Sequence, residues 1–145
     1  MNQKKINEYV PLDIESVVED SVYTTLPEGY YVARYVGTKL MEGTHGKFLR
    51  HKYEVNVGKY ATSDLINLYD LSDMEIRTKN KLGRIYKAFV RDYTIGEKLN
   101  LGELVGEGSQ YAIIKVKPIT NEKGYIENTI LEYLPYSKDI PLKEI

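Results

Sequence analysis

FLRHKYEVNV, residues 48–57, alternates between two kinds of side chain along its whole length. One set is mostly apolar or aromatic: Leu49, His51, Tyr53, Val55 and Val57. The other set is more polar and carries two cations: Phe48, Arg50, Lys52, Glu54 and Asn56. Successive side chains of a β-strand point to opposite faces. We therefore expect a strand with one face in a core and a cationic, partly aromatic face at the surface.

A second stretch, residues 109–117, repeats this arrangement. Its expected inward set is Ala112, Ile114 and Val116, and its outward set is Tyr111, Lys115 and Lys117, with Ile113 between them. Cations neutralise phosphates, and aromatic rings stack on unpaired bases. The two stretches therefore indicate a surface for single-stranded nucleic acid, provided that the fold places them side by side.

The composition is that of one globular domain. The chain has 145 residues, of which 42% are hydrophobic and 28% charged, and these values are ordinary for a folded domain. No run approaches the roughly 18 apolar residues of a membrane-spanning helix, and the first residues lack the apolar run of a signal peptide. We therefore expect a cytoplasmic protein without a membrane partner. The absence of cysteine excludes disulfides and thiolate chemistry.

Charge is spread unevenly along the chain, although the net charge is only −1. Residues 1–28 carry two basic and six acidic side chains, and residues 29–110 carry 13 basic and 10 acidic ones. An acidic leader thus precedes a modestly basic body. This balance argues against tight duplex binding, whereas a single-strand binder needs only a local cationic groove.

Five segments have the composition of strands, and one between them has the period of a helix. The expected strands are residues 30–40, 48–57, 59–68, 109–117 and 125–134. The helical stripe comprises Leu82, Ile85, Tyr86, Phe89, Val90 and Tyr93. Either Ser72 with Glu75 forms a capping box or Thr78 opens the helix, and Gly96 is expected to mark its end. The opposite side of the helix is basic, with Lys81, Arg84, Lys87 and Arg91.

The order β-β-β-α-β-β is that of the oligonucleotide-binding (OB) fold, a five-stranded Greek-key barrel with a helix between strands three and four. We therefore predict a mainly β protein of this class. Its expected parts are an acidic leader over residues 1–26, an OB-fold domain over residues 27–136 and a short tail over residues 137–145. Such barrels have open edges, so a homodimer is compatible with the pattern.

The segment from Leu26 to Pro135 resembles phage-encoded proteins related to single-stranded-DNA-binding proteins. The likeness begins with Leu-Pro-x-Gly-x-Tyr at residues 26–31, continues with Tyr-x-Val at residues 53–55 and with Leu-x-x-Leu-Val-Gly at residues 101–106, and includes residues of the last two strands. It departs from the family pattern at Glu107, where a lysine is usual, and in the tail, which lacks a strictly acidic tip. The resemblance implies an OB-fold and a role in phage replication or recombination.

Enzyme chemistry is not indicated. The two histidines, His45 and His51, do not have a metal-ligand spacing, and His51 on an apolar strand face is expected to be a core residue. Gly102, Gly106 and Gly108 lack the Lys-Ser or Lys-Thr ending of a phosphate loop. We expect no catalytic residues, no cofactor and no metal.

The predicted function is sequence-independent binding of single-stranded DNA, with RNA left open. The predicted contacts are Arg34, Phe48, Arg50, Lys52, Tyr60, Tyr111, Lys115 and Lys117, with an auxiliary cationic helix face at Lys81, Arg84, Lys87 and Arg91. Replication or recombination proteins are the expected protein partners. The alternative is a small phage adaptor or inhibitor that binds a host protein through the barrel or the acidic leader.

Overall fold

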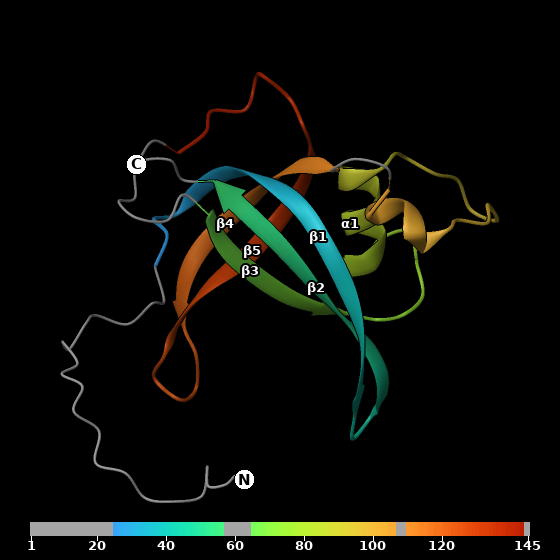
Figure 1. Cartoon of the computed structure of the whole chain (residues 1–145), viewed down its shortest axis with the longest axis horizontal. Coiled ribbons are helices and arrows are strands. Elements are labelled where there is room, and N and C mark those ends of the chain that lie inside the picture. Colours follow the sequence, from blue (N-terminus) through green and yellow to red (C-terminus); the bar gives the residue numbers. More distant parts are fainter. Residues whose placement is uncertain (1–24, 57–64, 107–109, 144–145) are drawn as a thin grey trace, which may run out of the picture.

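A single antiparallel sheet of five strands forms the body of the protein (Figure 1). The structure, a computed structural model, describes residues 25–56, 65–106 and 110–143. Its elements are β1 (Gly29–Gly43), β2 (Gly46–Asn56), β3 (Leu65–Ser72), α1 (Lys81–Phe89), the short 3-10 helix η1 (Leu101–Leu104), β4 (Tyr111–Thr120) and β5 (Ile126–Pro135). The strand order across the sheet is β3-β2-β1-β4-β5. The expected mainly β class and the order β-β-β-α-β-β are confirmed.

The sheet is not closed. β3 and β5 are its two edge strands, and no strand pairing joins them within the described part of the chain. A five-stranded barrel is therefore not established. The expected leader lies almost entirely outside the described residues, as do residues 59–64 of the expected third strand and Tyr60.

Two boundary predictions around the helix are wrong. β3 continues to Ser72, whose hydroxyl bonds to Nε2 of the buried His51 at 2.7 Å, so Ser72 belongs to the sheet and caps no helix. The N-cap of α1 is instead Asn80, whose Oδ1 accepts from the backbone N–H of Gly83 at 2.9 Å. The helix ends at Phe89, well before Gly96, which lies in a turn with a φ of 90°.

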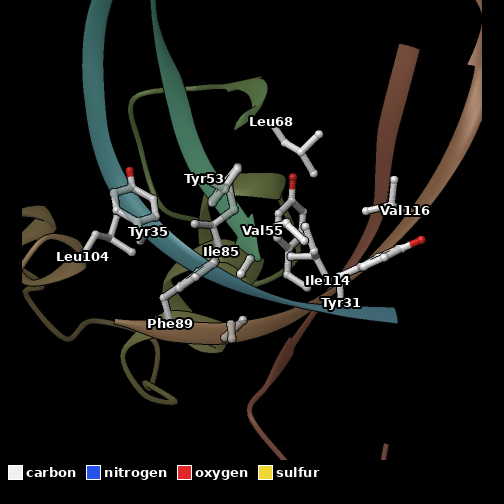
Figure 2. Packing of buried hydrophobic residues seen from close by; sticks show 14 of the residues in the cluster. Tyr31, Tyr35, Tyr53, Val55, Leu68, Ile85, Phe89, Leu104, Ile114 and Val116 are labelled. Carbon is white, nitrogen blue, oxygen red and sulfur yellow. The ribbon is translucent and has the colours of Figure 1, made fainter. Parts of the chain in front are cut away.

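α1 packs on the core side of the sheet, against β4 and β5. The predicted apolar stripe is confirmed for the four residues that lie on the helix, Leu82, Ile85, Tyr86 and Phe89, all of which are buried. Val90 and Tyr93 follow the helix and pack against the same core. The core itself is rich in aromatic rings, and the rings of Tyr35 and Phe89 meet edge to face at 5.4 Å (Figure 2).

The tyrosine-rich composition is explained partly by this core. Tyr35, Tyr53 and Tyr86 are essentially inaccessible to solvent, with exposed fractions of 1%, 0% and 0%. Each hydroxyl nevertheless has a partner: Tyr35 pairs with Thr38 and His51, Tyr53 with Asp70, and Tyr86 with Glu103. Tyrosine is tolerated at these three positions because each hydroxyl makes a hydrogen bond. The buried hydroxyl of Tyr133, by contrast, has no hydrogen-bond partner among the described residues.

Gly83 is expected to be intolerant of any side chain. A Cβ there would overlap the carbonyl oxygen of Arg77 and the hydroxyl of Tyr93, so the gain in helix propensity from alanine is outweighed by overpacking. We expect Gly83→Ala to lower the free energy of unfolding by about 2 kcal/mol. Gly37→Ala is the matched control, because nothing lies within 4 Å of its added Cβ. Urea denaturation of both variants measures the difference, and equal stability would contradict this packing.

Candidate nucleic-acid interface

The face of the sheet turned away from the core, called the outer face below, carries the predicted strand contacts. On β2 the inward residues His51, Tyr53 and Val55 are buried, so the alternating residues lie on the outer face. The predicted contacts found there, none of them fully buried, are Arg34, Phe48, Arg50, Lys52, Tyr111, Lys115 and Lys117. The alternation read from the sequence thus assigns these side chains to the correct face.

Strand register separates these residues into two groups. Arg50 and Lys52 on β2 pair with Lys39 and Gly37, near the far end of β1. Lys115 on β4 pairs with Tyr30, at the start of β1. Tyr30 and Lys39 are nine positions apart, which at about 3.3 Å per residue corresponds to roughly 30 Å of strand. The cations of β2 and β4 therefore share a face but do not lie side by side. The predicted nucleic-acid surface depended on their lying side by side.

Ion pairs distinguish the two groups further. Arg34 is engaged by Glu54, which accepts from its Nε at 2.9 Å. Lys115 lies 3.7 Å from Glu132. By contrast, no carboxylate of the described segments forms an ion pair with Lys39, Arg50 or Lys52. The cations near the β1–β2 hairpin therefore keep their charge available for a ligand.

Two residues missed in the sequence complete the β2 group. The guanidinium carbon of Arg50 lies 4.0 Å from the ring centroid of Tyr69 on β3, a cation–π geometry, and Tyr69 is 43% exposed. Tyr69 was missed because the third strand was expected to end at Leu68. The alternation of Asn67, Tyr69 and Leu71 with buried Leu68 would have revealed it. Lys39, paired directly with Arg50, is the second.

Two hollows flank the edge of β3 next to this group. The first, of about 380 Å³, lies between β3 and β5, and Tyr69, Leu71, Asn128 and Lys81 are among its lining residues. The second, of about 390 Å³, is lined by Phe48, Leu71, Ser72, Asp73 and Lys81. Both volumes fall within the range of about 300 to 1,000 Å³ that is common for ligand sites. We call the set Lys39, Phe48, Arg50, Lys52, Tyr69 and Lys81 the β2–β3 patch.

The remaining helix cations lie elsewhere. Arg84 and Lys87 are exposed on α1, which covers the core side of the sheet. Arg91 follows the helix and is 2.5 Å from Glu97, and Lys87 is 3.9 Å from Asp92. Of the predicted auxiliary helix face, only Lys81 therefore reaches the β2–β3 patch.

A buried polar network lies directly beneath the patch. His51 Nδ1 is 2.7 Å from the hydroxyl of Tyr35, and burial lowers the pKa of His51 to about 4. The hydroxyl of Tyr53 donates to Asp70 Oδ1 at 3.0 Å, and burial raises the pKa of Asp70 to about 6. Lys81 opposes the shift at Asp70 and adds to that at His51. His51 is thus the core histidine expected from the sequence.

A third hollow, of about 550 Å³, lies apart from this face. It is formed by the loops on either side of α1, with Ile76, Tyr93 and Leu101 among its lining residues. Ile95 at this site is 89% exposed. None of the predicted contacts lines it.

Comparison with known proteins gives no assignment, since no protein-family model and no curated protein matches the chain. Among residues 25–56, 65–106 and 110–143, no group of three histidine or acidic side chains could hold a metal ion. Within the same residues, no helix is long and apolar enough to cross a membrane.

The two buried ionisable groups are expected to give opposite dependences of stability on pH. The folded pKa of His51 is below its ordinary 6.5, so the unfolded chain takes the proton first and His51 costs stability as the pH falls from about 6.5 to 4. The folded pKa of Asp70 is above its ordinary 3.8, so the folded chain takes the proton first and Asp70 adds stability as the pH falls below about 6.

Removal of either group should reveal the pH dependence of stability that the other group causes. Between pH 7 and pH 4 we expect the unfolding free energy of Asp70→Asn to fall by about 3 kcal/mol relative to the native protein. His51→Gln should change in the opposite direction by a similar amount. Urea denaturation at four pH values measures both, and pH profiles parallel to that of the native protein would show that neither group is buried as described.

Proposed function

We propose that the protein binds single-stranded DNA, without catalysis, through the β2–β3 patch. The observation that carries the proposal is the exposed Tyr69 ring with Arg50 over it, next to Lys39 and Lys52, which form no ion pair within the described part of the chain. Cations spaced along a strand neutralise successive phosphates, and exposed rings provide stacking surfaces for bases. Phe48 and Tyr69 supply such rings at the two hollows.

The shape of the patch favours a single strand over a duplex. Its rings line hollows at a sheet edge, where an unpaired base can enter but a stacked base pair cannot. The net charge of −1 also argues against the broad positive surface that duplex binding usually requires. We therefore assign the ligand class as a flexible, unpaired strand.

We expect a bound strand to run across the outer face from the β2–β3 patch toward β4. From Arg50 and Lys52 it passes over β1 to Tyr111, which is 52% exposed and pairs with Arg34. Lys117 lies further along β4, at the distant end of the face. The span of roughly 30 Å along β1 from Lys39 to Tyr30, the partner of Lys115, suits the site size of about 4 to 16 nucleotides typical of OB-folds.

The strand order supports an OB-fold interpretation of the open sheet. In β3-β2-β1-β4-β5, the two edge strands are the pair that must meet if the sheet is to close as a five-stranded barrel. The 380 Å³ hollow lies at the gap between them. Together with the resemblance of residues 26–135 to phage single-strand binders, this order supports a role in phage replication or recombination.

The first test is fluorescence anisotropy with labelled oligo-dT at low salt. We expect binding that weakens with salt and that is strongly reduced in Lys39→Ala/Arg50→Ala/Lys52→Ala. If Lys39 and Lys52 each contact a phosphate, the slope of log affinity against log salt should decrease in magnitude by about 1.4.

Arg84→Ala/Lys87→Ala is the control, because it removes two exposed cations on the core side and should leave the slope nearly unchanged. Melting temperatures establish that each variant is folded. Absence of oligo-dT binding at tens of micromolar native protein would refute the proposal and leave the adaptor role as the remaining hypothesis. Equal losses in the two variants would refute the assignment to the β2–β3 patch.

A further inference from the structure

The guanidinium of Arg50 lies over the ring of Tyr69. Its guanidinium carbon lies 4.0 Å from the ring centroid, so the planar cation covers one face of the tyrosine ring. In register, Lys39 lies beside Arg50 on β1 and Leu71 lies beside it on β3. A guanidinium held in this way loses little conformational freedom when it makes a further hydrogen bond.

The donors of Arg50 remain available. Among the residues that the structure describes, Arg50 has no ion pair, whereas Arg34 on the same face is engaged by Glu54. A guanidinium has five N–H donors in one plane, and stacking on a ring uses none of them. The free edge of Arg50 can therefore bind a ligand that offers two neighbouring acceptors in that plane.

Only some bases offer such a pair. Guanine presents O6 and N7 as adjacent acceptors, the commonest partner of arginine in base recognition. Adenine places a donor beside its N7, and thymine has a methyl group beside its O4. In an unpaired strand the O2 and N3 atoms of cytosine are also adjacent acceptors. Hydrogen bonding to Arg50 therefore depends on the identity of the base, whereas stacking on an aromatic ring does not.

We propose that Arg50, positioned by Tyr69, makes the affinity for a single strand depend on its bases. Guanine is bound most tightly, cytosine next, and adenine and thymine least tightly. This inference rests on the proposed function and differs from the sequence-independent binding that the sequence alone predicts. A phosphate also offers two oxygens to an arginine fork. However, Lys39 and Lys52 flank Arg50 and supply point charges for the phosphates, which leaves the fork for a base.

The experiment compares four 12-nucleotide strands of alternating thymine and a second base, which is guanine, cytosine, adenine or thymine. Anisotropy is measured in lithium salt, which suppresses guanine quadruplexes. We expect the guanine strand to bind at least about fivefold more tightly than the adenine and thymine strands. In Arg50→Lys, which keeps the charge but loses the fork, all four affinities should become equal within twofold.

Matched variants separate reading of the base from attraction to the phosphate. Lys39→Ala should weaken all four strands by the same factor and preserve their order. Tyr69→Leu should reduce the preference at constant charge, and Tyr69→Phe should retain it, because the ring and not the hydroxyl holds the guanidinium. Melting temperatures exclude unfolding as the cause.

Several results would overturn the inference. If the native protein binds all four strands with equal affinity, the guanidinium of Arg50 binds phosphate and not a base. The proposed function is then unaffected. A preference for both purines indicates that base stacking causes the difference in affinity. A guanine preference that persists in Arg50→Lys indicates that other residues recognise guanine. If no strand binds, the proposed function itself fails, and the inference fails with it.

Discussion

The register in which β2 pairs with its two neighbours determines the rest of the structure. Tyr53 pairs with Tyr35 on β1 and with Leu68 on β3, and all three face the core. Because side chains alternate with a period of two, a slip of one residue would bring Arg50 and Lys52 inside and expose His51 and Tyr53. The contacts of Tyr53 with Tyr35 and Phe89 oppose that slip, so the packing of the core also fixes which cations reach the surface.

The same constraint accounts for the polar network under the surface. His51 cannot leave the inward set without moving its neighbours, so its two nitrogens are satisfied inside, by Tyr35 and Ser72. Hydrogen bonding is incomplete further along β3, because Asp70 Oδ2 is buried without a hydrogen-bond partner among the residues that the structure describes. An unpaired buried carboxylate oxygen is costly, and Asp70 lines the hollow between β3 and β5. This unsatisfied polar atom therefore lies at the open edge of the sheet.

Local pattern was sufficient to predict the order of the strands, the part of the apolar stripe that lies on the helix and the outward face of β2, because alternation and helical period are properties of neighbouring residues. It was not sufficient to predict register, since Lys115 and Arg50 are related only through the different positions on β1 with which they pair. The end of β3 was missed because Ser72 resembles a helix cap in sequence, whereas its hydroxyl is bound by His51, twenty-one positions away. Tyr69 was not recognised because the predicted strand ended one residue before it. The ion pair of Arg34 with Glu54 was also not predictable, because it depends on the pairing of β1 with β2.

Carboxylates explain how a chain of net charge −1 can offer a cationic site. Three cations form ion pairs with glutamates: Arg34 with Glu54, Lys115 with Glu132 and Arg91 with Glu97. These cations therefore contribute little to the net electrostatic field. Lys39, Arg50 and Lys52 have no such partner among the described residues and lie on adjacent strands. Salt at moderate concentration screens surface charges that are more than about 10 Å apart. The positive charge of this protein is therefore local rather than spread over its whole surface, which is why the proposed ligand is a flexible strand and not a rigid duplex.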